Sequence, residues 1–255
     1  MTIIGLWVTL GVSRHQFLLK ARRTMPRFFI CGDPHGEFDH ILHAVETEHP
    51  DAVILLGDME LPAPIDVVFG RIHARIPIWW IPGNHDTEKE EAYDFLYGSA
   101  LSTNTLHGRV VAICGIRVAG LGGVFRSKIW NGQDARYRSQ ADYIESCGKG
   151  NRWRGGLPLR HRSSIFPSDV ANLSIERADI LVTHEAPGSH PYGNVALTEL
   201  AHHLGVKAAF HGHHHETISY PGRIWHGVGL REIYRFDSSA QDPPSHGKRI
   251  ELERG

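Results

Sequence analysis

The sequence predicts an α/β protein in which β-strands alternate with amphipathic helices. Two features carry this prediction. Short, wholly apolar runs recur along the chain, as expected of strands that are covered on both faces. Between them lie segments whose apolar residues repeat at i, i+3, i+4 and i+7, the spacing of one helical face. This alternation is typical of βαβ units with parallel strands.

The first half of the predicted domain contains three such strands, at residues 28–31, 53–56 and 78–81. Glycine follows the first two runs, and a Pro-Gly pair breaks the third. Helices are expected between the strands, with a further short helix near residues 88–96. The helical spacing is carried by Phe38, Ile41, Leu42 and Val45, and then by Ile65, Val68, Phe69 and Ile72.

The second half begins with a predicted hairpin at residues 110–119, because two strand-like runs flank a Cys-Gly turn. Buried strands are expected at residues 180–183 and 208–210, and hairpin strands continue to about residue 236. A helix should lie between the two buried strands. Its apolar face is formed by Leu197, Leu200, Ala201 and Leu204.

We expect one domain over residues 25–236, flanked by two segments of different character. The apolar stretch 3–12 is too short to cross a bilayer, and basic residues follow it, the reverse of a secretory signal. We therefore interpret residues 1–24 as an N-terminal extension that is disordered or is not translated in the native protein. Residues 237–255 are polar and are expected to form a frayed tail.

The composition favours a metal enzyme of a reducing compartment. The chain has 19 histidines, and neutral imidazole is the commonest metal ligand. Its three cysteines are too few for a disulfide framework or a thiolate zinc site, which indicates a cytoplasmic location. With a net charge of −1, the protein as a whole has no strong electrostatic attraction to nucleic acid or to a membrane surface. We therefore expect neither a membrane partner nor specific nucleic-acid binding.

Five polar clusters punctuate the scaffold, each directly after an apolar strand. They occupy residues 32–36, 57–60, 83–86, 183–185 and 211–215. Taken singly, each cluster is more often a turn, a helix cap or a solvated loop than a metal site. Together they provide carboxylates, imidazoles and an amide at the carboxyl ends of strands, where ligands bind in α/β sheets. The combined pattern indicates a metal centre.

The order Asp-x-His, Gly-Asp, Gly-Asn-His-Asp, His and Gly-His-x-His resembles the calcineurin-like metallophosphoesterase superfamily. The resemblance spans Asp33 to His215 and has no ligand position missing. It implies two packed mixed β-sheets flanked by helices, a four-layer sandwich, with a dinuclear metal site at the strand ends. The alternation of elements alone would fit a doubly wound sheet equally well.

The resemblance also implies the ligands of two divalent or trivalent metal ions. The first ion would be held by Asp33, His35 and His215, the second by Asn84, His184 and His213, and Asp58 would bridge both. Oxygen and imidazole ligands without thiolates suit Mn, Fe or Zn, and the sequence does not distinguish between them.

In such a centre a hydroxide between the two metals attacks phosphorus, and the ions stabilise an in-line displacement. By resemblance, His85 would stabilise the transition state or protonate the leaving oxygen. Asp86 stands beside it in the sequence and could orient and charge-stabilise that imidazole. We therefore take His85 and Asp86 as the catalytic candidates.

Residues 126–162 offer the best indication of the substrate. They lack clear periodicity and carry nine Lys or Arg residues against three Asp or Glu, so we interpret them as a basic loop or cap inserted in the domain. Trp130 and Trp153 could line a substrate or anchor this segment to the core. The candidates for clamping phosphate oxygens are Arg126, Arg136, Arg138, Arg152 and Arg154, although a solvated surface explains any one of them equally well.

The leading hypothesis is a phosphomonoesterase whose partner is a phosphoprotein, a nucleotide or a small phosphate ester. The opening motif resembles serine/threonine protein phosphatases, but residues 59–62 replace their Asp-Arg-Gly turn, and Asp86 replaces their usual glutamate. These departures keep a phosphodiesterase or dinucleoside polyphosphate hydrolase as an alternative. A catalytically silent scaffold on the same fold is the alternative of a different class. The sequence does not indicate the oligomeric state.

Overall fold

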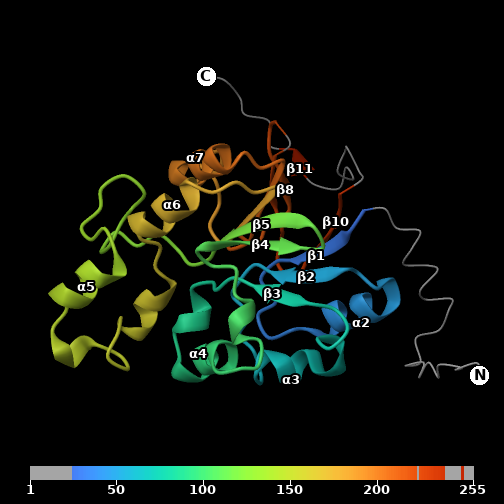
Figure 1. The fold of residues 1–255 in the computed structure, drawn as a ribbon, viewed down its shortest axis with the longest axis horizontal. Helices are drawn as coiled ribbons and strands as arrows, with labels where there is room; N and C mark the ends of the chain where they lie inside the picture. Colours follow the sequence, from blue (N-terminus) through green and yellow to red (C-terminus); the bar gives the residue numbers. More distant parts are fainter. Residues whose placement is uncertain (1–24, 223, 239–247, 250–255) are drawn as a thin grey trace, which may run out of the picture.

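The computed structural model describes residues 25–222, 224–238 and 248–249, so the predicted extension 1–24 lies outside the described residues. Two β-sheets form the centre of the molecule (Figure 1). The first has the strand order β10-β1-β2-β3 and the second β11-β8-β9-β7-β6-β5-β4. The first comprises β1 (Arg27–Cys31), β2 (Ala52–Leu55), β3 (Ile78–Trp80) and β10 (Ile233–Asp237). The second comprises β4 (Arg109–Ile113), β5 (Ile116–Leu121), β6 (Ile180–Thr183), β7 (Ala208–His211), β8 (Ile218–Ser219), β9 (Trp225–Gly227) and β11 (Lys248–Arg249).

Both sheets are mixed. In the first, β1, β2 and β3 run parallel while β10 pairs with β1 in the antiparallel direction. In the second, β5, β6, β7 and β9 run parallel, and the hairpin partner β4 is antiparallel to β5. The predicted fold class, two packed mixed β-sheets flanked by helices, is therefore confirmed.

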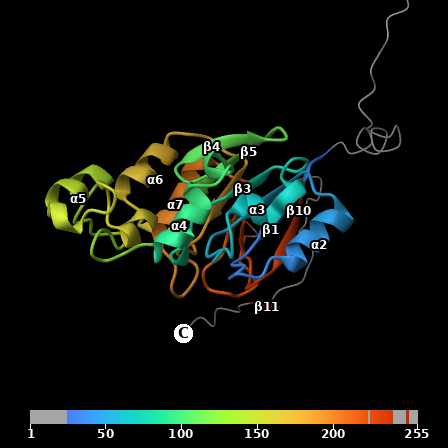
Figure 2. The same ribbon diagram turned by 90° about the horizontal axis from the view of Figure 1, so that it is seen from below.

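Helices cover the outer faces of the two sheets (Figure 1). One outer layer is formed by α2 (Asp39–Glu48), α3 (Ile65–Phe69) and α4 (Glu90–Tyr97), and the other by α6 (Pro167–Ser174) and α7 (Val195–Leu204). Short α5 (Gln140–Ser146) lies to one side, away from the sheets, in both ribbon views (Figure 2). Single 3-10 turns are η1 (Gly70–Ile72), η2 (His85–Thr87), η3 (Ser102–Asn104), η4 (Lys149–Asn151) and η5 (Leu159–Ser163).

Strand β1 is apolar from Phe28 to Cys31 because each of its faces is buried against a different layer. In β1, Phe28 and Ile30 pack between the two sheets, whereas Phe29 and Cys31 pack under the helices of the first outer layer. All four side chains have 0% exposure. Successive side chains of a strand point to opposite faces, so a strand buried on both sides must be apolar at every position.

Residues 126–162, which the sequence indicates are a basic loop or cap, contain α5, η4 and η5. Helix α5 begins with a capping box in which the Ser139 side chain accepts from the Asp142 N–H and Asp142 accepts from the Ser139 N–H. Only Tyr143 of this helix is buried, so there is no apolar periodicity to find. The eight-residue helix α6 was missed for the same reason, since only Leu173 is buried.

The two ends of the described domain lie beside each other. The N–H of Ser238 donates to the carbonyl oxygen of Pro26 at 3.3 Å. Most of the tail predicted over residues 237–255 lies outside the described residues. Within it, Lys248 and Arg249 pair in parallel with β8. Among the helices of the described residues, none is long and apolar enough to cross a membrane.

Candidate metal centre

The five polar clusters lie in the loops at the carboxyl ends of β1, β2, β3, β6 and β7. Backbone hydrogen bonds tie the first two loops together, since the N–H of His35 donates to the carbonyl of Asp58 at 3.1 Å and that of Gly36 to Met59 at 2.9 Å. Parallel strands place these loops along one edge of the sheets. Side chains that are far apart in the sequence are thereby brought together.

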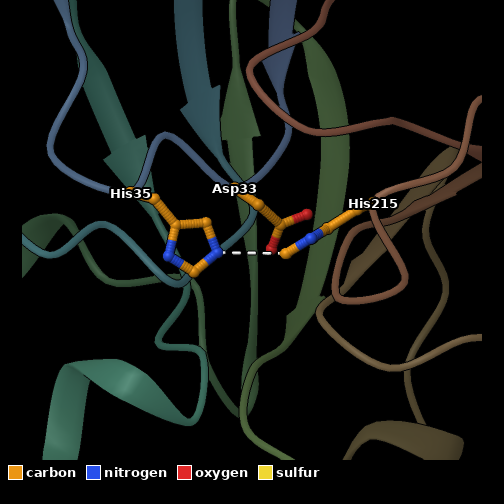
Figure 3. A group of neighbouring side chains, drawn as sticks. All are labelled: Asp33, His35 and His215. Carbon is orange, nitrogen blue, oxygen red and sulfur yellow. Dashed lines mark hydrogen bonds between the residues drawn. The ribbon is translucent and has the colours of Figure 1, made fainter.

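One group of possible ligands combines Asp33 and His35, from the loop after β1, with His215, from the loop after β7 (Figure 3). One ligand atom from each of the three residues lies within 4.8 Å of the other two. The Nε2 atoms of His35 and His215 face each other at 3.0 Å (Figure 3). Asp33 is fully buried, whereas His215 is exposed, so the group opens to solvent on one side.

A second group combines Asp58, His184 and His213, again with ligand atoms within 4.8 Å of one another. His184 Nδ1 lies 2.8 Å from the carbonyl oxygen of Leu56, which fixes the orientation of the ring. Its Nε2 lies 3.4 Å from Asp58 Oδ2 and 3.3 Å from the Asn84 side-chain oxygen. The predicted ligands of the second metal and the predicted bridging carboxylate thus meet around one nitrogen atom.

The charges of these groups favour the binding of a cation. Burial raises the pKa of Asp33 to about 6. Burial also opposes the charge of Asp58, but His184 and hydrogen bonds hold the pKa of Asp58 below its usual range. Although burial opposes a charge on His184 too, the carboxylates of Asp58 and Asp33 raise the pKa of His184 to about 10. Two buried carboxylates therefore draw a proton onto one imidazole, and a metal cation would supply the same compensation.

Several ligand candidates adopt a backbone conformation that L-residues rarely take. Positive φ angles are found at Asp33 (33°), His35 (43°), Asp58 (48°), His213 (70°) and His215 (59°). Such residues cost of order 1–3 kcal/mol each and cluster at functional sites, where the surrounding structure holds them in place. Five of the ten non-glycine residues with positive φ among the described residues are thus predicted ligands.

Two glycines allow the ligand loops to approach each other. Gly57 has a φ of +102°, and a Cβ at this position would lie 2.7 Å from His184 Nδ1. A Cβ on Gly83 would overlap Asp58 Oδ1 and lie 2.7 Å from His184 Cε1. Any larger residue at either position would displace the imidazole of the second group.

His85 lies at the edge of both groups, with its side chain 39% exposed. Its Nε2 lies 3.9 Å from Asp58 Oδ2 and therefore faces the ligand groups. Its Nδ1 lies 2.8 Å from Glu60 Oε1, and the same oxygen lies 3.3 Å from His35 Nδ1. Glu88 adds a second carboxylate at 3.6 Å. Carboxylates thus hold the His85 imidazole at Nδ1. Its other nitrogen, Nε2, faces the ligand groups.

The structure gives Asp86 other partners than the predicted His85. Its carboxylate accepts the N–H of Met59 at 2.9 Å and the N–H of Gly83 at 2.7 Å, and the side chain is buried. Asp86 therefore joins two ligand loops, while Glu60 takes the position beside His85. The physical reason is that η2 turns the chain at His85, so neighbouring side chains leave in different directions.

Two of the five arginines proposed as phosphate clamps are used in structural contacts. Arg154 pairs with Asp94 of α4 through two bonds of 2.5 and 2.8 Å. Arg152 donates to the carbonyl of Ile144 in α5 at 2.6 Å. These contacts hold the cap segment together and attach it to α4.

The remaining three arginines differ from one another. Arg136 and Arg138 are exposed. Arg126 is partly buried, and its guanidinium donates to the hydroxyls of Ser164 and Ser163 at 3.1 and 3.3 Å. The charges of Glu88, Glu185 and Asp58 act on this guanidinium and raise its pKa, against the larger effect of burial.

The two tryptophans anchor the segment. Trp153 donates to Glu90 at 2.7 Å, and Trp130 is buried against Phe125 with the ring centroids 5.1 Å apart.

A family model for the calcineurin-like phosphoesterases matches residues 26–217. The chain belongs to this family. The match begins one residue before β1 and ends beyond the last ligand loop, so it covers all five polar clusters. The family groups metal-dependent phosphoesterases.

The chain is also similar to two individual proteins. An uncharacterized protein of Haemophilus influenzae is 44% identical over 208 residues, which cover 80% of this chain and 91% of that protein. The crystal structure of the protein TT1561 of Thermus thermophilus matches with a TM-score of 0.51 and 15% identity, and the match covers 84% of this chain and 99% of that chain. The second likeness shows the shared fold.

Sequence reasoning gave no role to two acidic residues of the centre. Glu60 lies within the cluster that follows β2, and Glu185 follows His184 directly. Glu185 groups with His213 and His214, and burial raises the pKa of Glu185 to about 7. Both residues lie in polar clusters that the sequence had already indicated. Their position in those clusters was the sign by which a role at the site could have been predicted.

Proposed function

We propose that the chain is a dinuclear metal-dependent phosphomonoesterase that acts on a phosphoprotein or a small phosphate ester. The observation that carries the proposal is the juxtaposition of two ligand groups with the Nε2 atom of His85. Asp33, His35 and His215 would hold one ion. Asn84, His184 and His213 would hold the other, with Asp58 shared. Bound ions would polarise the phosphoryl group and acidify the attacking water.

The chain's own residues supply the proton for the leaving group. In the imidazolium form of His85, Nδ1–H donates to Glu60 and Nε2–H is directed toward the ligand groups. A proton on Nε2 is therefore placed to pass to the leaving oxygen as the ester bond breaks. The carboxylate of Glu60 stabilises the charged imidazole before the transfer and fixes the ring.

Arg126 supports the choice of a monoester. Burial and Arg160 lower the pKa of its guanidinium, while Glu88, Glu185 and Asp58 act in the opposite direction, which places the guanidinium near the carboxylates of the centre. A phosphate monoester carries more negative charge than a diester. A partly buried cation at the rim therefore favours the monoester.

A phosphodiesterase or dinucleoside polyphosphate hydrolase is the second candidate function. It is favoured by the residue at position 60, where a glutamate, not an arginine, lies beside His85. A carboxylate here tolerates a diester better than a dianionic monoester. Retention of both ligand groups and His85 argues against a silent scaffold.

The test compares 4-nitrophenyl phosphate with bis(4-nitrophenyl) phosphate after the protein has been stripped of metal and reloaded with Mn²⁺. We expect faster turnover of the monoester and loss of turnover in the metal-reloaded Asp58→Asn variant. Preference for the diester would transfer the assignment to the second candidate. Absence of turnover on both esters, with two metals bound per chain, would contradict the proposal.

A further inference from the structure

A cavity separate from the metal centre lies in the cap, which we define as residues 126–162. Its volume is about 390 Å³, within the ~300–1,000 Å³ typical of small-molecule sites. No lining residue belongs to either ligand group of the metal centre. The lining residues include Lys128, Tyr137, Tyr143, Ser146, Cys147 and His161.

One wall of the cavity is aromatic. The rings of Tyr137 and Tyr143 lie 4.8 Å apart at an interplanar angle of 84°. The imidazole of His161 continues the wall, 4.9 Å from the Tyr143 ring. Tyr143 is only 4% exposed, so its ring is fixed by packing. A planar group that enters the cavity would gain offset or edge contacts with the partly exposed rings of Tyr137 and His161.

The electrostatic character of the cavity is positive. Its lining contains no Asp or Glu. The Lys128 ammonium lies 5.8 Å from the centroid of the Tyr143 ring, and within the described ranges no ion pair joins it to a carboxylate. Burial, together with the charges of Arg126, Lys128 and Arg160, lowers the pKa of His161 to about 4. An anion would relieve this accumulation of positive charge.

We propose that the cap cavity binds an anionic ligand with a planar ring, of the class of the nucleoside monophosphates. The ring packs against the partly exposed Tyr137, which Tyr143 holds in place, and the phosphate pairs with Lys128. The site does not depend on the reaction at the metal centre. It is nevertheless connected to that centre, since His161 Nδ1 and Arg126 Nε both lie 3.1 Å from the hydroxyl of Ser164.

Cys147 provides a local reporter because it lines the cavity and is partly exposed. In a Cys114→Ser background the remaining cysteines are Cys147 and buried Cys31. The experiment measures the rate at which the full-length, metal-loaded protein reacts with Ellman's reagent. The probe is the methylenephosphonate analogue of AMP, whose P–C bond resists hydrolysis. Adenosine and methylphosphonate test the ring and the anion separately.

We expect the AMP analogue, at about ten times its Kd, to slow the labelling of Cys147 about 10-fold by mass action. Lys128→Ala should abolish this protection at the same concentration, and Lys128→Arg should restore it. Arg136→Ala is the matched control, since Arg136 is an exposed cation of the cap outside the cavity lining, and it should keep full protection.

Three results would overturn the proposal. They are no protection at millimolar analogue, equal protection in Lys128→Ala, and equal protection by methylphosphonate alone. The readout is the reactivity of a thiol, so failure here would leave the proposed phosphomonoesterase activity unaffected.

Discussion

Replacing Asp86 with alanine tests whether this residue stabilises the fold, as its contacts indicate, or supports His85, as its place in the sequence suggests. In the structure, its carboxylate accepts the backbone N–H groups of Met59 and Gly83. The side chain is 1% exposed, so water cannot replace the carboxylate in the folded state without a rearrangement. The substitution should therefore weaken the fold, because it leaves two buried donors without acceptors.

The expected size of the effect follows from those two donors. A buried donor left unsatisfied costs about 1–3 kcal/mol, so the pair corresponds to roughly 2–6 kcal/mol. This is a large part of the ~5–15 kcal/mol that stabilises a typical domain. Asp86→Asn should lose less, because its amide oxygen can still accept one of the two hydrogen bonds.

The assay is urea unfolding of the metal-loaded protein followed by tryptophan fluorescence. Asp134→Ala is the matched control, since it removes an aspartate whose side chain is exposed at the surface, where substitutions cost little. Turnover per folded, metal-loaded molecule is measured in parallel. An unchanged unfolding free energy together with a collapse of turnover would refute the reasoning and restore Asp86 as the partner of His85.

Two further predictions concern His85 and its carboxylate partner. His85→Asn should lower turnover roughly 10²-fold while metal content stays intact, measured by steady-state kinetics and metal analysis. A loss of both would point to folding or ligation instead. Glu60→Gln should lower kcat about 10-fold, because Glu60 contacts His35 and His85 together, whereas Glu88→Gln, which changes a more distant carboxylate, should cost less. Equal kcat values for these two variants would contradict the assignment of Glu60.

The central strands could be predicted because burial on both faces leaves a local sequence signal. Residues 180–183 were predicted as a strand, and β6 has those same bounds. The cap lacked such a signal. Its helix α5 is capped by polar groups and buries only Tyr143, so hydrophobic periodicity cannot identify it. Cap helices of this kind are stabilised by particular hydrogen bonds and not by a repeated pattern.

Residue types at the site could be predicted because each ligand follows a strand in a recognisable motif. The partner of His85 could not, because adjacency in sequence differs from adjacency in space. Asp86 is the next residue, yet its carboxylate turns inward to Met59 and Gly83. Glu60 reaches His85 from the loop after β2. Only the pairing of β2 with β3 brings these two loops together.

The left-handed backbone of the ligand residues is the feature that sequence conceals most completely. Glycine is the usual sign of a positive φ, yet Asp33 and His213 adopt one although each carries a side chain, as Asp and His do more often than most residues. Glycine at either position would remove the strain and also the ligand. The strain is offset by tertiary contacts, since the His213 N–H donates to the Asp33 carboxylate at 2.9 Å. The same contacts that make the metal centre therefore also hold its backbone, and neither can be deduced from the chain without the other.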